Sequence, residues 1–167
     1  MKDEARIPDG LPQVIAPLAA FLGSAGLSNG DRATLRRMHF NQQPPLGFYK
    51  LALTRLPPGW DAGQLQRDWM VIVAGMCIMY PNIHRDDQPV GVELARAHYA
   101  EARLERLLAA NGDTRRTLVL RLTRFLASRH SACDWNDVAG LLLIRDPDKL
   151  ERLHRRIASH FYATQIQ

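Results

Sequence analysis

Cysteine is scarce in this chain of 167 residues, since Cys77 and Cys133 are the only two. Two cysteines cannot build a disulfide framework or a multi-cysteine zinc site. No apolar run reaches the roughly 18 residues that a membrane span requires, so we expect no membrane partner. The first ten residues carry acids and no apolar stretch, which argues against a signal peptide and predicts a cytoplasmic protein.

Lysine is also rare, so the positive charge is almost entirely arginine. The chain has 19 Arg and 3 Lys against 17 acidic residues, which gives a net charge of +5. The planar guanidinium group binds phosphate oxygens in pairs, whereas the lysine ammonium group is a point charge. A genome rich in G and C would produce the same bias without any structural reason. The positions of the arginines therefore have to decide between these two explanations.

Alternation of apolar and polar residues, the pattern of a half-buried strand, is nearly absent. Apolar residues instead recur with the 3.6-residue period of helices, and the 46% hydrophobic and 23% charged content is typical of a packed globule. We therefore predict an all-α bundle of about seven to eight helices in two small lobes, 1–82 and 90–167, joined by the loop 81–90. Turn signals place these helices at 12–22, 29–38, 44–56, 61–80, 92–110, 114–129, 134–144 and from 147 almost to the end.

Catalytic motifs are few. The chain lacks HExxH, GxxxxGK[ST], GxGxxG and GxSxG. His84 precedes Asp86 and Asp87 and could form half of a metal site in a small metal-dependent hydrolase. His130 and Cys133 offer two of the four ligands that a zinc ion needs. Neither set is complete, so we predict no enzymatic activity, no metal and no cofactor.

Arginines recur at turn-length spacing in several of the predicted helices. In 92–110 the residues Arg96, Arg103 and Arg106, with Tyr99 between them, follow one stripe beside the apolar face. The stripe of the next helix has no acidic residue between Thr114 and Cys133. The predicted nucleic-acid-binding residues are Arg32, Arg36, Arg37, Arg96, Arg103, Arg106, Arg116, Arg121 and Arg124, and a further outward cluster is Arg152, Arg155 and Arg156.

Unpaired arginines at this spacing repel one another unless a polyanion lies across them, as a nucleic-acid backbone would. The sequence shows no recognition-helix signature, so we predict backbone contact without sequence reading. A solvated polar face explains most single stripes of this kind, and a helical adaptor could use the same arginines to bind an acidic protein. Tyr99 could stack on an unpaired base or lie at the edge of the core.

The order of the segments resembles a known family. NGDRATLRRM at 29–38, FYKL at 48–51, VAGMCIMYP at 73–81 and VGVELARA at 90–97 come in a familiar sequence. EARLERLL, RLTRFL, DWNDVAGLLL and a closing RRIASHFY complete it. Together these segments, over roughly 25–163, resemble the CasB family, the small subunit of the type I-E CRISPR surveillance complex Cascade.

This resemblance implies a non-catalytic, two-lobed helical subunit that is present as two copies, head to tail. It implies contact with the backbone subunits that coat the guide RNA and with the large subunit of Cascade. It also implies a basic surface that holds the target strand and the displaced strand during R-loop formation, while guide pairing reads the sequence. The positions that match basic residues of the family are Arg36, Arg37, Arg96, Arg103 and Arg124.

Overall fold

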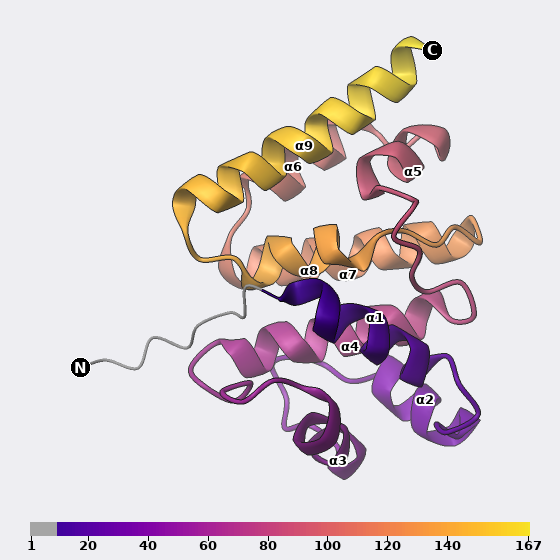
Figure 1. Cartoon of the computed structure of the whole chain (residues 1–167), viewed down its shortest axis with the longest axis vertical. Coiled ribbons are helices and arrows are strands. Elements are labelled where there is room, and N and C mark those ends of the chain that lie inside the picture. The colour runs from indigo at the N-terminus through magenta and orange to yellow at the C-terminus, as the bar shows by residue number, and fades with distance from the viewer. Residues whose placement is uncertain (1–9) are drawn as a thin grey trace.

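The computed structural model describes residues 10–167, and across this range it contains α-helices and no β-strand. The all-α prediction is therefore confirmed, although the described residues form nine helices rather than seven or eight. They are α1 (Leu11–Leu22), α2 (Asn29–Arg36), α3 (Leu46–Arg55), α4 (Leu65–Met79), α5 (Val90–Arg96), α6 (Glu101–Ala109), α7 (Gly112–Ser128), α8 (Trp135–Leu143) and α9 (Pro147–Ile166) (Figure 1).

The single helix predicted over 92–110 is wrong, because the chain breaks between α5 and α6. His98 adopts a left-handed conformation with φ of 58°. Its N–H donates to the Ala95 carbonyl at 3.1 Å, and the Tyr99 N–H donates to the Leu94 carbonyl at 2.9 Å. This pair of bonds is a Schellman cap, which usually uses glycine at the left-handed position. The sequence shows no glycine there, so it did not predict the break.

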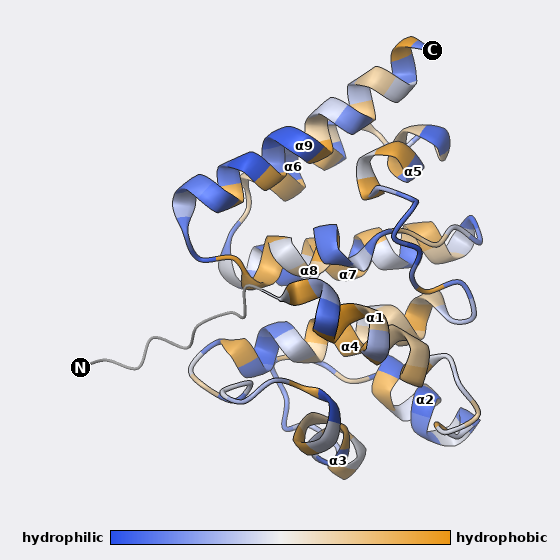
Figure 2. Ribbon diagram, in the orientation of Figure 1, coloured by the Kyte–Doolittle hydropathy of each residue, from blue (hydrophilic) through white to orange (hydrophobic). Residues whose placement is uncertain are grey.

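Helix α4 lies at the centre of the fold. Eleven of its fifteen residues are buried, and it packs against α7, α2, α8 and α1. In Figure 1 it lies between α3 below and α7 and α8 above, and Figure 2 shows apolar residues along much of its length. Figure 2 also shows that the outward face of α9 is hydrophilic. One hydrophobic core therefore draws on residues from both halves of the chain.

Two glycines allow helices to approach closely. A Cβ atom on Gly75 of α4 would lie 2.7 Å from Cη2 of Trp135 and 2.9 Å from Cγ2 of Thr123. A Cβ atom on Gly91 of α5 would overlap the Ile157 carbonyl oxygen of α9. Because interiors are packed to crystal-like density, these positions fix how near α7 and α8 come to α4, and how near α9 comes to α5.

The loop that follows α4 runs beside the segment between α7 and α8. The Arg85 N–H donates to the Cys133 carbonyl at 3.0 Å, and the Asp134 N–H donates to the Gln88 carbonyl at 2.7 Å. These hydrogen bonds join the loop between α4 and α5 to the loop between α7 and α8, although the two loops are distant in the sequence. The division into lobes 1–82 and 90–167 stays a prediction, and α4 with α7 and α1 with α8 are in contact across it.

Candidate nucleic-acid interface

Arg32 is a structural residue and does not lie on an exposed ridge as predicted. Its side chain is 6% exposed, and its guanidinium group lies 3.9 Å from the centre of the Tyr80 ring. The guanidinium donates to main-chain carbonyls at the end of α1 and in the following loop, and to the Asn29 side chain. These acceptors are Leu22 at 2.9 Å, Ser24 at 3.0 Å, Leu27 at 3.2 Å and Asn29 Oδ1 at 2.8 Å.

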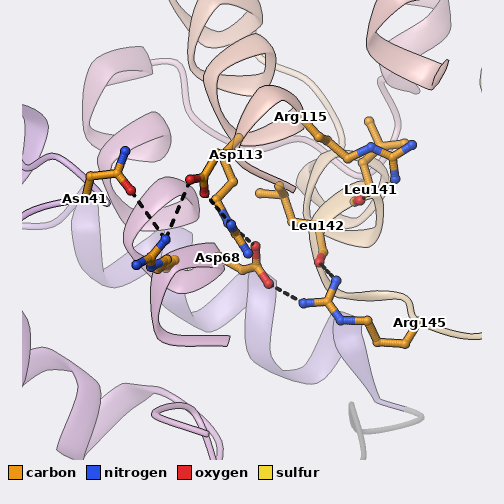
Figure 3. Close-up of polar contacts among 9 residues, drawn as sticks. Asn41, Asp68, Asp113, Arg115, Leu141, Leu142 and Arg145 are labelled. Carbon is orange, nitrogen blue, oxygen red and sulfur yellow. Dashed lines mark hydrogen bonds and ion pairs between the residues drawn. The ribbon is translucent and has the colours of Figure 1, made fainter. Parts of the chain in front are cut away.

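Arg116 is also buried, at 4% exposure, and it is neutralised by two carboxylates. Its Nε donates to Asp68 at 2.8 Å and its Nη1 donates to Asp113 at 2.6 Å. The second oxygen of Asp68 accepts from Arg145 at 2.5 Å (Figure 3). Asp68 itself lies on the buried face of α4, so this network joins α4 to α7 and to the loop before α9. The predicted role of Arg116 on an exposed stripe is therefore wrong.

The neighbouring Arg115 is a buried residue that sequence reasoning missed. Its guanidinium donates to the carbonyls of Leu141 and Leu108, both at 2.9 Å, and lies 3.2 Å from Nε2 of His154. In the described residues it contacts no carboxylate. Burial lowers the pKa of Arg115, and the nearby Arg145 charge lowers it further. The one available sequence signal was Asp68, an acid within the apolar stretch of α4, and it indicated a buried partner such as Arg116 rather than Arg115.

Arg96 does not share a continuous helical stripe with Arg103 and Arg106, because the helix is interrupted between α5 and α6. It is exposed, and its Nη1 donates to Glu93 at 2.9 Å. Glu93 is buried and also accepts from the Ser131 hydroxyl at 3.0 Å. Arg96 is therefore partly neutralised within the molecule.

The three arginines of the predicted outward cluster on the last helix, Arg152, Arg155 and Arg156, are exposed, but two of them form ion pairs. Arg155 pairs with Glu151 at 2.6 Å, and Arg156 pairs with the buried Asp137 of α8 at 2.7 Å. Arg152 is exposed, and it has no ion pair with any carboxylate that the structure describes. Two of these three arginines thus serve within the molecule.

Four arginines do remain exposed and close together, on α6 and α7. Arg103 and Arg106 lie one turn apart on α6, while Arg121 and Arg124 lie one turn apart on α7. In residues 10–167 none of the four has an ion pair or a hydrogen bond through its side chain. We call these four residues the α6–α7 arginine cluster. It is the part of the predicted site in which exposed arginines lie near one another without forming an ion pair to any carboxylate in residues 10–167.

A cavity of about 350 Å³ lies within this cluster. Its lining combines three guanidinium groups with an apolar wall, and consists of Tyr99, Arg103, Arg106, Leu118, Arg121 and Phe125. The Tyr99 and Phe125 rings meet edge to face with centroids 4.9 Å apart. Tyr99 is 7% exposed, so it lies at the edge of the core and also forms part of the cavity wall. Burial raises the pKa of its phenol, and the charges of Arg103 and Arg106 oppose that rise.

Arg36 and Arg37 stand apart from this cluster. Both are exposed at the end of α2, which packs on α4 and α3. Figure 1 places α2 in the lower half of the molecule and α6 in the upper half. In the range that the structure describes, neither side chain has an ion pair.

The residues considered as metal ligands, and the two cysteines, are held by contacts within the fold. The Nδ1 atom of His84 accepts from the Trp135 N–H at 3.0 Å, and Asp87 pairs with Arg85. No group of three or more His, Cys, Asp or Glu side chains in residues 10–167 could hold a metal ion. Burial raises the pKa of the Cys77 thiol to about 12, and also raises that of Cys133. A thiol with such a pKa is a poor nucleophile at neutral pH.

The helices and the arginine cluster define the class: an all-helical protein with a basic, cavity-bearing surface. Within the described range, none of the helices has the length and apolar character to cross a membrane. The family model for CRISPR-associated protein Cse2 matches residues 31–162. The chain therefore belongs to the Cse2 family, also called CasB, and the family predicted from the order of its segments is confirmed.

A solved structure has the same fold. It is a chain from the crystal structure of E. coli Cascade bound to a PAM-containing dsDNA target with a 32-nt spacer. The TM-score is 0.65 at 21% sequence identity, and the match covers 90% of this chain and 95% of the other. The comparison with curated protein sequences found no match.

Proposed function

We propose that this protein is a non-catalytic small subunit of a type I-E Cascade complex, and that the α6–α7 arginine cluster binds nucleic-acid backbone. The observation that carries the proposal is the gathering of four exposed arginines, from two helices, without a carboxylate among the described residues to neutralise them. Phosphate groups along a strand would supply the missing negative charge and release counterions as they bind.

Family membership supports the assembly. The similar chain of known structure belongs to a Cascade that is bound to a dsDNA target. In the same arrangement this subunit would contact the backbone subunits, the large subunit and a second copy of itself, in the cytoplasm. Its nucleic-acid ligands would be the guide-paired target strand and the displaced single strand. Holding them would stabilise the R-loop in antiviral defence, with the sequence read by base pairing.

The arginines outside the cluster divide into two groups. Arg36 and Arg37 are exposed and without ion pairs in the described chain, so we include them as a separate backbone contact. Arg32 and Arg116 are excluded because their side chains are buried and their guanidinium groups donate to acceptors inside the fold. Phosphate contacts position a strand without reading its bases, so we expect no sequence preference from this surface.

The test is charge reversal within the assembled complex. The double variant Arg103→Glu/Arg124→Glu should copurify with the other subunits and the guide RNA, and it should lose retention of target DNA. For four phosphates on single-stranded DNA the log–log salt slope of the cluster is about 2.8, and the double variant should lower the measured slope by at least about 1.4. The matched control is Lys50→Glu on the exposed face of α3.

Two results would contradict this proposal. Unchanged DNA retention over a range of salt would show that the cluster does not hold phosphates. Loss of the neighbouring subunits with DNA binding intact would show that the arginines bind an acidic protein surface, as in an adaptor.

A further inference from the structure

We infer that the cavity of the α6–α7 arginine cluster takes up one unpaired nucleotide, base and phosphate together, from a single strand. This inference rests on the proposed function and specifies what the cluster binds. The proposed function requires only phosphate contacts along a surface, whereas the structure has a hollow lined by both apolar side chains and guanidinium groups.

The apolar side chains of the lining, which we call the apolar wall, are Leu118 and Phe125, and both are fixed in place. Leu118 and Phe125 lie on the cavity side of α7, and both pack against the hydrophobic core. The edge-to-face contact with Tyr99 orients the Phe125 ring from a second segment of the chain. A nucleobase that enters the cavity would find a preformed apolar surface, and aromatic side chains favour bases of any identity because every base has a π-face.

The charge of the lining comes from both helices. Arg103 and Arg106 reach it from α6, and Arg121 reaches it from α7. The Tyr99 hydroxyl adds a donor that has no hydrogen-bond partner within residues 10–167. Three cations around one hollow repel one another, and a phosphate placed between the two helices would relieve that repulsion. Arg124, one turn beyond Arg121 on α7, is placed to hold the next phosphate of the same strand.

The combination points to a nucleotide. A free anion would use the arginines and leave the apolar wall bare, while an apolar ligand would leave three cations without counterions. A volume of about 350 Å³ lies at the small end of ligand cavities and suits a single nucleotide unit. A base within a duplex is stacked and paired and cannot enter without being extruded, so the cavity selects an unpaired strand.

The experiment compares oligonucleotides with equal numbers of phosphates. Binding of the purified full chain is measured for dT12 and for a twelve-unit abasic strand of the same backbone. Insertion of one base predicts that dT12 binds roughly 5- to 150-fold more tightly, by the usual gain from stacking one base on an aromatic side chain. A U12 arm shows whether the sugar matters, since both DNA and RNA can supply an unpaired nucleotide.

Variants separate the contributions of the apolar and the charged side chains of the lining. Phe125→Leu should remove most of the preference for dT12 over the abasic strand and leave the salt slope unchanged. Arg121→Gln should weaken both strands by a similar factor, and Lys50→Gln should change neither. Phe125 contacts the core, so its substitution also affects packing. A second measurement therefore uses the protein without any substitution. The fluorescence of one 2-aminopurine in an otherwise dT strand should change on binding if the base packs against the apolar wall.

Each outcome decides the inference. Equal binding of dT12 and the abasic strand, with unchanged 2-aminopurine fluorescence, would overturn it and leave backbone binding by the cluster intact. Absence of binding to either strand at low salt would overturn it together with the proposed backbone contact. Tight binding of an acidic, aromatic peptide instead of the oligonucleotides would overturn both in favour of a protein partner.

Discussion

The two parts of α7 carry the same residue type in opposite environments. In its first turns Arg115 and Arg116 are buried, and their guanidinium groups donate to carbonyls and carboxylates respectively. Further along, Arg121 and Arg124 are exposed and have no polar side-chain partner in the described residues. The difference comes from the neighbours, because Arg115 and Arg116 meet the Leu141 carbonyl of α8 and Asp68 of α4, while Arg121 and Arg124 lie on an exposed face of α7. An arginine's role is therefore set by the element packed beside it.

The largest expected effect on stability comes from removing Asp68, the carboxylate that pairs with the buried Arg116. Asp68→Asn leaves Arg116 buried with one remaining carboxylate and removes the partner of Arg145, so it should lower the free energy of unfolding by about 3–5 kcal/mol. Urea denaturation measures this change, with the exposed Asp61→Asn as control. Equal stability of Asp68→Asn and the unaltered protein would show that the two parts of α7 do not differ energetically.

A second prediction extends the comparison to α2, where Arg32 is buried and Arg36 is exposed. Arg32→Lys keeps the positive charge but removes the planar guanidinium group that donates to four oxygen acceptors. It should therefore lower the free energy of unfolding by about 2 kcal/mol. Arg36→Lys should change the free energy of unfolding by less than about 0.5 kcal/mol. Thermal unfolding of the two variants side by side tests this, and equal midpoints would contradict it.

The third prediction concerns pH and the contact between Arg115 and His154. Burial lowers the pKa of His154 from its ordinary value of 6.5, and the Arg115 guanidinium lowers it further. A histidine whose pKa is lower in the folded state binds protons more readily when unfolded, so its contribution is present above pH 6.5 and is lost as pH falls below it. The loss should be smaller than the first two effects, because His154 is only partly buried.

The variant His154→Gln isolates that contribution. Its unfolding free energy should fall less between pH 7.5 and pH 5 than that of the unaltered protein, since glutamine can accept from Arg115 without titrating. Identical pH profiles for the two proteins would show that His154 makes no contribution in this window.

The smallest effect on stability is expected at the exposed end. Arg103→Ala/Arg121→Ala should change the free energy of unfolding by less than about 0.5 kcal/mol, with a slight gain at low salt from reduced repulsion. The same variant should weaken single-strand binding clearly. A loss of stability comparable to that of Asp68→Asn would show that these arginines also belong to the fold.

The helical periodicity of the sequence predicted the fold class well, because apolar residues at 3.6-residue spacing are enforced by core packing along α4, α7 and α9. It missed the break between α5 and α6 because His98 occupies the left-handed capping position. Cap geometry of this kind depends on local hydrogen bonds that residue type indicates only when glycine is present.

The candidate site was predicted only in part. Arg116 and Arg124 project about 80° apart on a helical wheel, so periodicity alone could not separate a buried arginine from an exposed one. The separation depends on Asp68, which lies 48 residues away in the sequence. The cavity depends on α6 meeting α7, and such a contact between helices leaves no local pattern in either segment.

The missing side chain at Gly91 has a consequence for the binding surface. Because no atom stands between α5 and the Ile157 carbonyl, α5 rests directly on α9, and α6 begins five residues after α5 ends. We expect that Gly91→Ala would displace α5 from α9. Because α6 follows α5 closely, Arg103 and Arg106 would then move away from Arg121. The spacing of three cations thus depends on a residue that has no charge and no contact with any ligand.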